Sequence, residues 1–214
     1  MKLHALTLTT IVLVVVAAVI GAALYDRLPD RVATHFDIHG HPDGSTAKGV
    51  AILIAPVLVA LLGLLFAALP RISPKGYRLE PFQRTYEIIA IAVLVVAFTD
   101  VMMSLWFALG HPIEVNRVVT LGTGLLFVVI GNFLGKVTRN FFVGIRTPWT
   151  LANDEVWLRT HRIGGLLFVA GGAVILIAGF VGTAGSLAVM ISVITAIVLF
   201  LTVYSYVLYR RIET

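Results

Sequence analysis

Six long apolar runs constrain the fold of this 214-residue chain more than any other feature of its sequence. They cover residues 6–24, 50–69, 86–109, 118–134, 163–181 and 186–208. A helix that crosses the hydrocarbon core of a bilayer needs about 20 apolar residues, with a range of about 17–25. The alternating polarity of a barrel strand is absent, and a spanning segment must satisfy its own backbone polar groups. The sequence therefore predicts an all-α, polytopic membrane protein with six transmembrane helices.

Composition and charge distribution support this class and predict an orientation. Charged residues make up 13% of the chain, whereas soluble domains carry about 25%. If the N-terminus is cytoplasmic, only four of the 16 Lys and Arg residues lie outside, namely Arg27, Arg31, Lys48 and Arg117. Cytoplasmic loops carry an excess of Lys and Arg, so both termini are predicted to be inside. The net positive charge then marks orientation and contact with anionic membrane lipid, and no motif indicates direct nucleic-acid binding.

Two units are predicted along the chain. Residues 1–70 would form an N-terminal two-helix membrane unit with an extracellular loop, and residues 86–214 a four-helix membrane unit. The basic connection between them is interpreted as a topological anchor. The chain has no Cys, which excludes disulfides, thiol catalysis and thiolate metal sites. No cofactor is predicted.

The first loop, residues 25–49, alternates imidazole and carboxylate groups. In an extended segment, a spacing of two residues places side chains on one face, where such groups could bind a divalent transition metal. The spacing is not that of a structural zinc site, so a polar extracellular turn is the alternative, and metal binding is only a weak candidate. The candidate ligands are His35, Asp37, His39, His41 and Asp43.

Asp100 lies well inside the third apolar run. An ionisable residue within a span is a functional-site hypothesis by default, here for proton or solute handling. The alternative is a hydrogen bond that packs helices together, with Thr123, Asn132 or a water as partner. No Lys or Arg lies deep in another run to pair with it.

The connection between the fourth and fifth runs concentrates the specialised residues of the chain, GNFLGKVTRNFFVGIRTPWTLANDEVWLRTHRIGG at 131–165. We expect a short interfacial helix in it that starts after Pro148, at Asn153, Asp154 and Glu155. Trp157 and His161 should lie on one face of that helix. The spacing of Gly131 and Gly135 predicts that the fourth and fifth spans are close neighbours. Asn132 should face that neighbour or a cavity. No activated nucleophile with an orienting third group is present, so the chain is not predicted to be an enzyme.

Arg146 is the residue of this connection that we expect to matter most. Gly144 before it lets the backbone turn, and Thr147-Pro148-Trp149 stiffens the backbone on its C-terminal side. We expect its guanidinium to reach Asp154, Glu155 or carbonyl groups near Asn132 and Asn140. Arg146→Lys should then lose function, because Lys lacks the planar fork, whereas Arg139→Lys should be silent.

These residues resemble a known family. The run GNFLGKVTRNFFVGIRTPWTL followed by VWLRTHRIGG is similar to the signature of the SdpI-type bacterial immunity proteins. The loop LPDRVATHFDIHGHPDG and the Lys after it resemble an uncharacterised membrane domain that commonly precedes that signature. The resemblance implies a multi-pass protein of the bacterial cytoplasmic membrane that protects the cell from a secreted toxic peptide. In the founding system it also implies signal transduction, in which a small transcriptional repressor is sequestered at the membrane.

The resemblance is carried by individual positions. In the central motif they are Asn132, Gly135, Lys136, Asn140, Gly144, Arg146, Thr147, Pro148, Trp149, Thr150, Leu151, Val156, Trp157, Thr160, His161, Arg162 and Gly164. In the first loop they are Pro29, His35, Phe36, Asp37, Gly40, Pro42, Asp43 and Lys48. Position 37 is often Asn in the family pattern, and His39 and His41 are not part of it.

Two other function classes stay open at this point. A proton-coupled membrane transporter would use Asp100 and the Gly-rich fourth and fifth spans. A membrane-embedded metallohydrolase would use the first loop.

Overall fold

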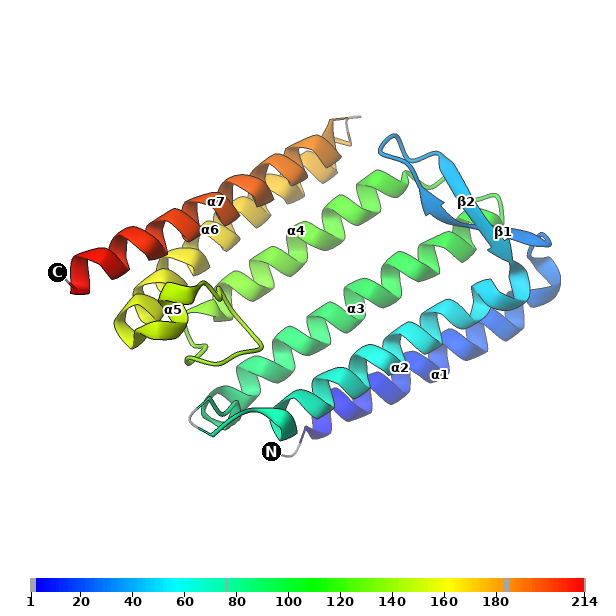
Figure 1. The fold of residues 1–214 in the computed structure, drawn as a ribbon. Coiled ribbons are helices and arrows are strands. Elements are labelled where there is room, and N and C mark those ends of the chain that lie inside the picture. Colours follow the sequence, from blue (N-terminus) through cyan, green and yellow to red (C-terminus); the bar gives the residue numbers. More distant parts are fainter. Residues whose placement is uncertain (1–2, 76, 183–184, 214) are drawn as a thin grey trace.

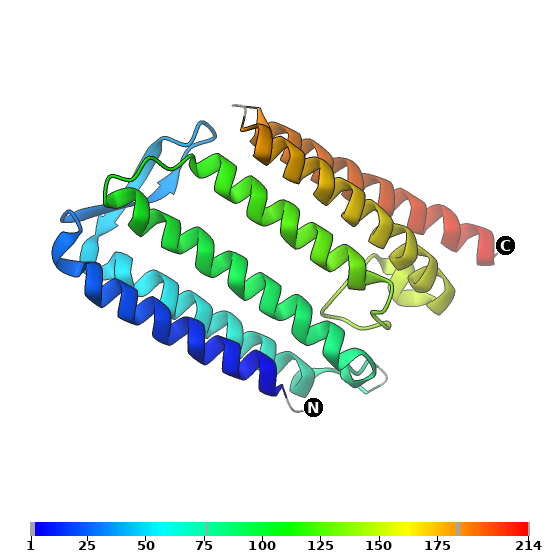
Figure 2. The same ribbon diagram turned by 180° about the vertical axis from the view of Figure 1, so that it is seen from behind.

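The computed structural model describes residues 3–75, 77–182 and 185–213. Six long helices run side by side through it (Figures 1 and 2). All six are long and apolar enough to cross a membrane, which confirms the predicted all-α, six-helix class. Their bounds are α1 His4–Leu24, α2 Lys48–Ile72, α3 Gln83–Ala108, α4 Val115–Leu134, α6 Asp154–Val181 and α7 Ser186–Glu213.

The loop between α4 and α6 contains one short helix, α5 Pro148–Ala152. Pro148 is its first residue, a position where proline is favoured because its nitrogen needs no hydrogen-bond partner there. The helix start expected at Asn153 is present, but it opens α6. The Asn153 side-chain oxygen accepts from the N–H groups of Glu155 at 2.9 Å and Val156 at 3.2 Å. The fifth spanning helix is therefore longer than its apolar run. An interfacial position for α5 stays a prediction.

The connection between α1 and α2 folds as an antiparallel hairpin, which the all-α prediction did not include. Its strands are β1 Arg31–Phe36 and β2 Pro42–Ala47, and Arg31 pairs with Ala47 in the register. Val32 is fully buried and packs with Leu28, Ala51 and Leu105, so one side of the hairpin rests on the helices. Two short 3₁₀ turns, Tyr25–Arg27 and Glu80–Phe82, precede the hairpin and α3.

Helices α4 and α6 touch along a line of glycines, which confirms that the fourth and fifth spans are neighbours. A Cβ on Gly131 would lie 2.8 Å from the carbonyl oxygen of Gly165, and one on Gly172 would lie 2.8 Å from that of Gly124. Gly135 lies at the edge of this contact. Its backbone nitrogen is 3.9 Å from the Cβ position of Gly165, but a Cβ on Gly135 itself would have no neighbour nearer than 4.0 Å. The spacing that matters is thus seven residues on each helix, two turns, and it lets the two backbones approach closely.

The largest buried cluster extends across both predicted units. Leu6 and Val59 from the first unit pack in it with Leu94 and Trp157 from the second. Tyr86 is buried in the same cluster and donates its hydroxyl to the Phe66 carbonyl at 2.5 Å. The division into units at 1–70 and 86–214 stays a prediction.

Candidate functional site: the α4–α6 loop

Residues 135–153 form an ordered loop at the end of the bundle opposite the hairpin (Figure 1). Three buried polar side chains hold its backbone in place, and their exposed fractions are 0% for Asn140, 0% for Thr150 and 1% for His161. Buried polar groups are costly unless hydrogen-bonded. Their partners therefore show what fixes the loop.

Asn140 organises the first turn of the loop. Its side-chain amide donates to the carbonyl oxygens of Thr138 at 2.8 Å and Val143 at 2.9 Å. Its side-chain oxygen accepts from the backbone N–H groups of Phe142 at 2.8 Å and Val143 at 2.7 Å. The whole hydrogen-bonding capacity of the amide is used within residues 138–143. Asn140 is therefore a structural residue of the loop, and its role is to close the turn.

His161 joins the loop to α6. Its Nε2 accepts from the backbone N–H of Ile145 at 3.0 Å, and its Nδ1 faces the carbonyl oxygen of Trp157 at 2.8 Å. The ring stacks on the Trp157 indole with centroids 3.9 Å apart. The indole in turn donates to the Val137 carbonyl at 2.7 Å. The predicted pairing of Trp157 and His161 is present, and it faces the loop.

Gly144 makes this arrangement possible. Its φ of 115° lies in a region that side chains rarely adopt, and a Cβ there would collide with Nε2 of His161. A larger residue would be strained in its backbone and would also displace the imidazole.

Threonines fix the second half of the loop. Thr147 caps α5 and its hydroxyl lies 3.0 Å from that of Ser205 on α7. The Thr150 hydroxyl donates to the Ile145 carbonyl at 2.8 Å and accepts from the Thr147 N–H at 2.9 Å. Trp149 packs against Tyr206, also on α7, with ring centroids 5.0 Å apart. The loop is thereby attached to α7 as well as to α6.

The ion pair with Asp154 that the sequence suggested for Arg146 is formed by Arg139. Arg139, and not Arg146, pairs with Asp154, at 2.8 Å. Arg139 also donates to the Leu151 carbonyl at 2.9 Å and lies over the Tyr77 ring at 5.3 Å. Arg146 is exposed and donates to the carbonyl of Phe141, next to Asn140. Of the partners expected for Arg146, a carbonyl near Asn140 is the one that it reaches. Asp154 pairs with Arg139 instead, because the turn at Asn140 brings Arg139 to that side chain.

The remaining central candidates lie around this loop without converging on one point. Asn132 is exposed and donates to the Val128 carbonyl one turn earlier in α4 at 2.8 Å, so it faces neither the neighbouring helix nor a cavity as expected. Lys136 lies over the Phe133 ring at 4.9 Å, and Arg162 is exposed on α6. Thr160 is fully buried, and its hydroxyl has no hydrogen-bond partner among the described residues.

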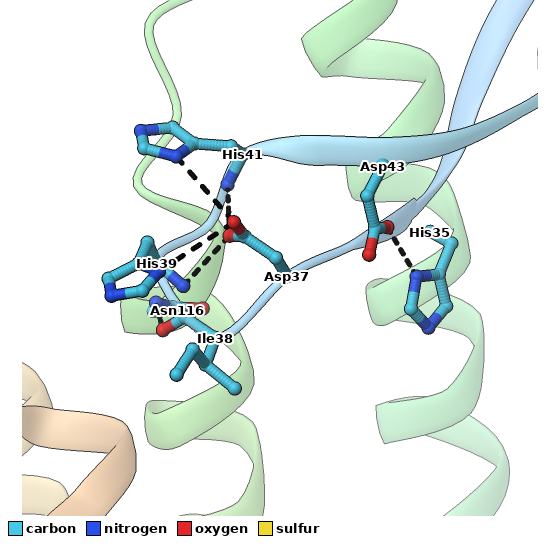
Figure 3. Close-up of polar contacts among 7 residues, drawn as sticks. All are labelled: His35, Asp37, Ile38, His39, His41, Asp43 and Asn116. Carbon is cyan, nitrogen blue, oxygen red and sulfur yellow. Dashed lines mark hydrogen bonds and ion pairs between the residues drawn. The ribbon is translucent and has the colours of Figure 1, made fainter.

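The five His and Asp residues of the first loop do not share one face, because the chain reverses between the strands. Figure 3 shows two groups, with His35 bonded to Asp43 in one and Asp37 between His39 and His41 in the other. Within the described residues, no three His, Cys, Asp or Glu side chains are placed to hold a metal ion. The single metal-binding face, a weak candidate in the sequence, is therefore not formed by these residues (Figure 3).

Asp37 closes the turn of the hairpin. Its carboxylate accepts the backbone N–H groups of His41 and His39, both at 2.8 Å. These N–H groups, that of His41 first, hold the pKa of Asp37 below its usual range. At the other end of the hairpin, Lys48 lies 3.3 Å from Asp30 and over the Tyr25 ring. Asp37 and Lys48, two positions of the first-loop resemblance, thus have structural partners.

Asp100 lines a cavity of about 400 Å³ beneath the hairpin. Neither of the partners expected for it, Thr123 and Asn132, bonds to it. Its Oδ1 is buried, and no hydrogen bond or ion pair of Asp100 is formed within residues 3–75, 77–182 and 185–213. A helix-packing hydrogen bond is therefore not its role among these residues.

Comparison with known proteins identifies both parts of the chain. Residues 136–205 match the SdpI/YfhL protein family, and residues 12–60 match a domain of unknown function, DUF1648. The chain is also similar to the Immunity protein SdpI of Bacillus subtilis (strain 168), with 23% identity over 207 residues, 95% of this chain and 96% of that protein. The chain is therefore similar to the SdpI/YfhL family over residues 136–205, and to one immunity protein over nearly its full length. No solved structure matches it.

Sequence reasoning missed several residues that hold the loop and the hairpin. Ser205 and Tyr77 contact the loop, and Val137 within it accepts from the Trp157 indole. Asn116 on α4 anchors the hairpin through the Ile38 carbonyl at 2.8 Å (Figure 3). Val137 carried no signal at all, because its backbone carbonyl makes the contact. Asn116 carried a weak signal, as an amide at the start of an apolar run.

Proposed function

We propose that this protein is a multi-pass immunity protein of the bacterial cytoplasmic membrane that protects its host against a secreted toxic peptide. The observation that carries the proposal is the similarity to the Immunity protein SdpI along almost the full length of both chains. The family match also covers residues 136–205, and so includes most of the ordered loop.

The arrangement of the hairpin and the loop at opposite ends of the bundle supports separate functions for the two ends (Figure 1). The hairpin lies at the end that the charge distribution places outside, and the ordered loop lies at the opposite end (Figure 1). In this proposal the peptide meets the hairpin side, and the loop passes the state of the bundle to a small transcriptional repressor inside. The conformation of the loop is stabilised by six of the predicted site residues, namely Asn140, Thr147, Pro148, Thr150, Trp157 and His161. Arg146 is an exposed cation of this loop.

A protection assay tests the proposal. The gene is deleted, and deletion and complemented cells are challenged with peptide fractions from culture fluid of the parental strain. The deletion should be killed at a lower dose than the complemented cells. Arg146→Lys should reach normal membrane levels and fail to protect. Arg159→Lys is the matched control, since Lys can keep the exposed i, i+4 pair that Arg159 forms with Glu155 at 2.6 Å. Equal survival of deletion and complemented cells with every fraction contradicts the immunity function.

The repressor step has its own experiment. A fluorescent fusion of a small repressor encoded beside this gene should move to the membrane when the active fraction is added. It should stay in the cytoplasm in cells that carry Arg146→Lys. Movement that does not depend on this protein removes the signalling part and leaves the protection part standing.

A proton-coupled carrier is the second candidate, favoured by the place of Asp100 in a cavity. It predicts that Asp100→Asn abolishes protection while Arg146→Lys retains it, the reverse of the immunity and signalling proposal. The metallohydrolase alternative has no comparable support, because the first-loop ligands are divided between two places.

A further inference from the structure

The cavity under the hairpin combines an apolar wall with one acid that lacks a partner. Its volume of about 400 Å³ lies in the range of small-molecule sites. The wall is formed mainly by aliphatic and aromatic side chains from the hairpin and from α2, α3 and α4, among them Val32, Phe36, Ala51, Val101, Leu105 and Val119.

Two contacts hold the turn side of the hairpin over this cavity, in addition to the packing of Val32. The Asn116 side-chain amide donates to the Ile38 carbonyl at 2.8 Å, and the Phe36 ring meets Phe107 on α3 edge-on at 5.2 Å (Figure 3 for the first). The polar atoms of the turn bond to one another, because the Asp37 carboxylate accepts two backbone N–H groups of the turn. The cover is therefore an ordered part of the site.

Asp100 is the polar group that the surroundings do not satisfy. On one side its Oδ1 lies 3.8 Å from the position that a Cβ on Gly122 would take. Among the described residues that line the cavity none is Lys or Arg, and no hydroxyl or amide bonds to the carboxyl group. An unpaired acid inside a spanning helix is costly and is retained where something is bound or moved. A cation that reaches it would make a charge-assisted hydrogen bond in surroundings of low dielectric constant.

We propose that this cavity binds a small apolar ligand that carries one protonated amine, with the amine on the Asp100 carboxylate and the apolar body between the hairpin and α3. The charge of the site selects this class. An anionic ligand would meet Asp100 and Asp37, and the imidazole of His35, which also lines the cavity, is bonded to Asp43. A purely apolar ligand would leave the Asp100 carboxyl group unsatisfied. The proposal concerns ligand binding by the isolated protein and does not depend on the immunity function.

Equilibrium binding to the full-length protein in phosphatidylcholine nanodiscs tests the proposal. The probe is radiolabelled 1-adamantylamine, and its neutral counterpart, 1-adamantanol, has the same apolar body. Empty nanodiscs give the lipid background. Wild type should bind the amine saturably and at least about tenfold more tightly than the alcohol, since a hydrogen bond to a charged group is worth that much.

Two variants locate the site. Asp100→Asn should remove the preference for the amine, while Asp26→Asn, the same change on an exposed residue outside the cavity, should leave it intact. Val119→Phe fills the cavity without touching the carboxyl group and should weaken binding of both probes. Size-exclusion profiles establish that each variant is folded. Absence of saturable binding to wild type, or equal affinity of wild type and Asp100→Asn for the amine, overturns the proposal.

Discussion

Ile145 donates its backbone N–H to Nε2 of His161 across 3.0 Å, and this bond fixes the middle of the α4–α6 loop to the first turns of α6. The acceptor must be an unprotonated nitrogen, and the other ring nitrogen faces the Trp157 carbonyl at 2.8 Å. The geometry therefore selects the tautomer with its proton on Nδ1. A residue that a sequence motif would suggest as an acid–base group is used here as a structural bridge.

Gly144→Ala should destabilise the protein by about 2 kcal/mol or more. The methyl group would meet His161 while the backbone kept a φ that alanine avoids. Thermal unfolding of a fluorescent fusion, followed by size-exclusion chromatography, measures the change. Gly135→Ala is the control, since the nearest atom to its added carbon is 4.0 Å away. If both variants unfold at the wild-type temperature, Gly144 is not required for the bridge.

Gly131→Ala should separate α4 from α6 and cost about 1–3 kcal/mol. The added carbon would lie 2.8 Å from the carbonyl oxygen of Gly165, which is backbone and cannot rotate away. The matched change is Gly122→Ala on the same helix, where the nearest atom is a Val96 methyl at 3.5 Å. Membrane level and unfolding temperature should fall for the first variant only. A fall of similar size in both would mean that α4 tolerates no added carbon anywhere.

Arg139 and Asp154 should be energetically coupled by about 0.5–1 kcal/mol. Their 2.8 Å ion pair is partly exposed, so the coupling is that of a well-aligned surface pair. A double-mutant cycle with Arg139→Gln and Asp154→Asn, each of which removes the charge of one partner, measures it from free energies of unfolding. The expectation that Arg139→Lys is silent is revised by this geometry. If the effects of the two single changes on the free energy of unfolding are strictly additive, the pair is not coupled, and Arg139→Lys is again expected to be silent.

The hairpin turn should lose stability as the pH falls. Because the folded-state pKa of Asp37 lies below its usual value, its carboxylate stabilises the turn above the ordinary Asp pKa, about 3.9. That contribution is lost as the pH falls further, through the lowered pKa of the folded state. Hydrogen exchange of the backbone amides of His39 and His41, measured between pH 7 and 3, reports it. Asp37→Asn should remove the pH-dependent step, and an unchanged step would assign it to another group.

Residues 45 and 138 should lie on opposite sides of the membrane. The chain has no Cys, so Ser45→Cys and Thr138→Cys each provide a single exposed thiol. A membrane-impermeant maleimide should label the first in intact cells and the second only after lysis. The reverse pattern would invert the topology, and with it the proposed outer and inner roles of the hairpin and loop.

The sequence by itself determined the six spanning helices and the contact of α4 with α6. Hydrophobicity over some 20 residues is a local quantity, and membrane insertion depends on little else. Glycine content marked the close contact, although only the structure showed that Gly124 and Gly131, spaced by seven, make it.

Only the tertiary structure decided which polar groups meet. The turn closed by Asn140 brings Arg139 into an ion pair with Asp154 and leaves Arg146 exposed. The chain reversal in the hairpin divides the His and Asp residues that an extended segment would have aligned. The cavity at Asp100 exists only because residues from the hairpin and from several helices enclose it. The physical reason is common to all three. A hydrogen bond acts over about 3 Å, so it depends on how distant segments are brought together, whereas the sequence pattern of a helix is set by its own residues.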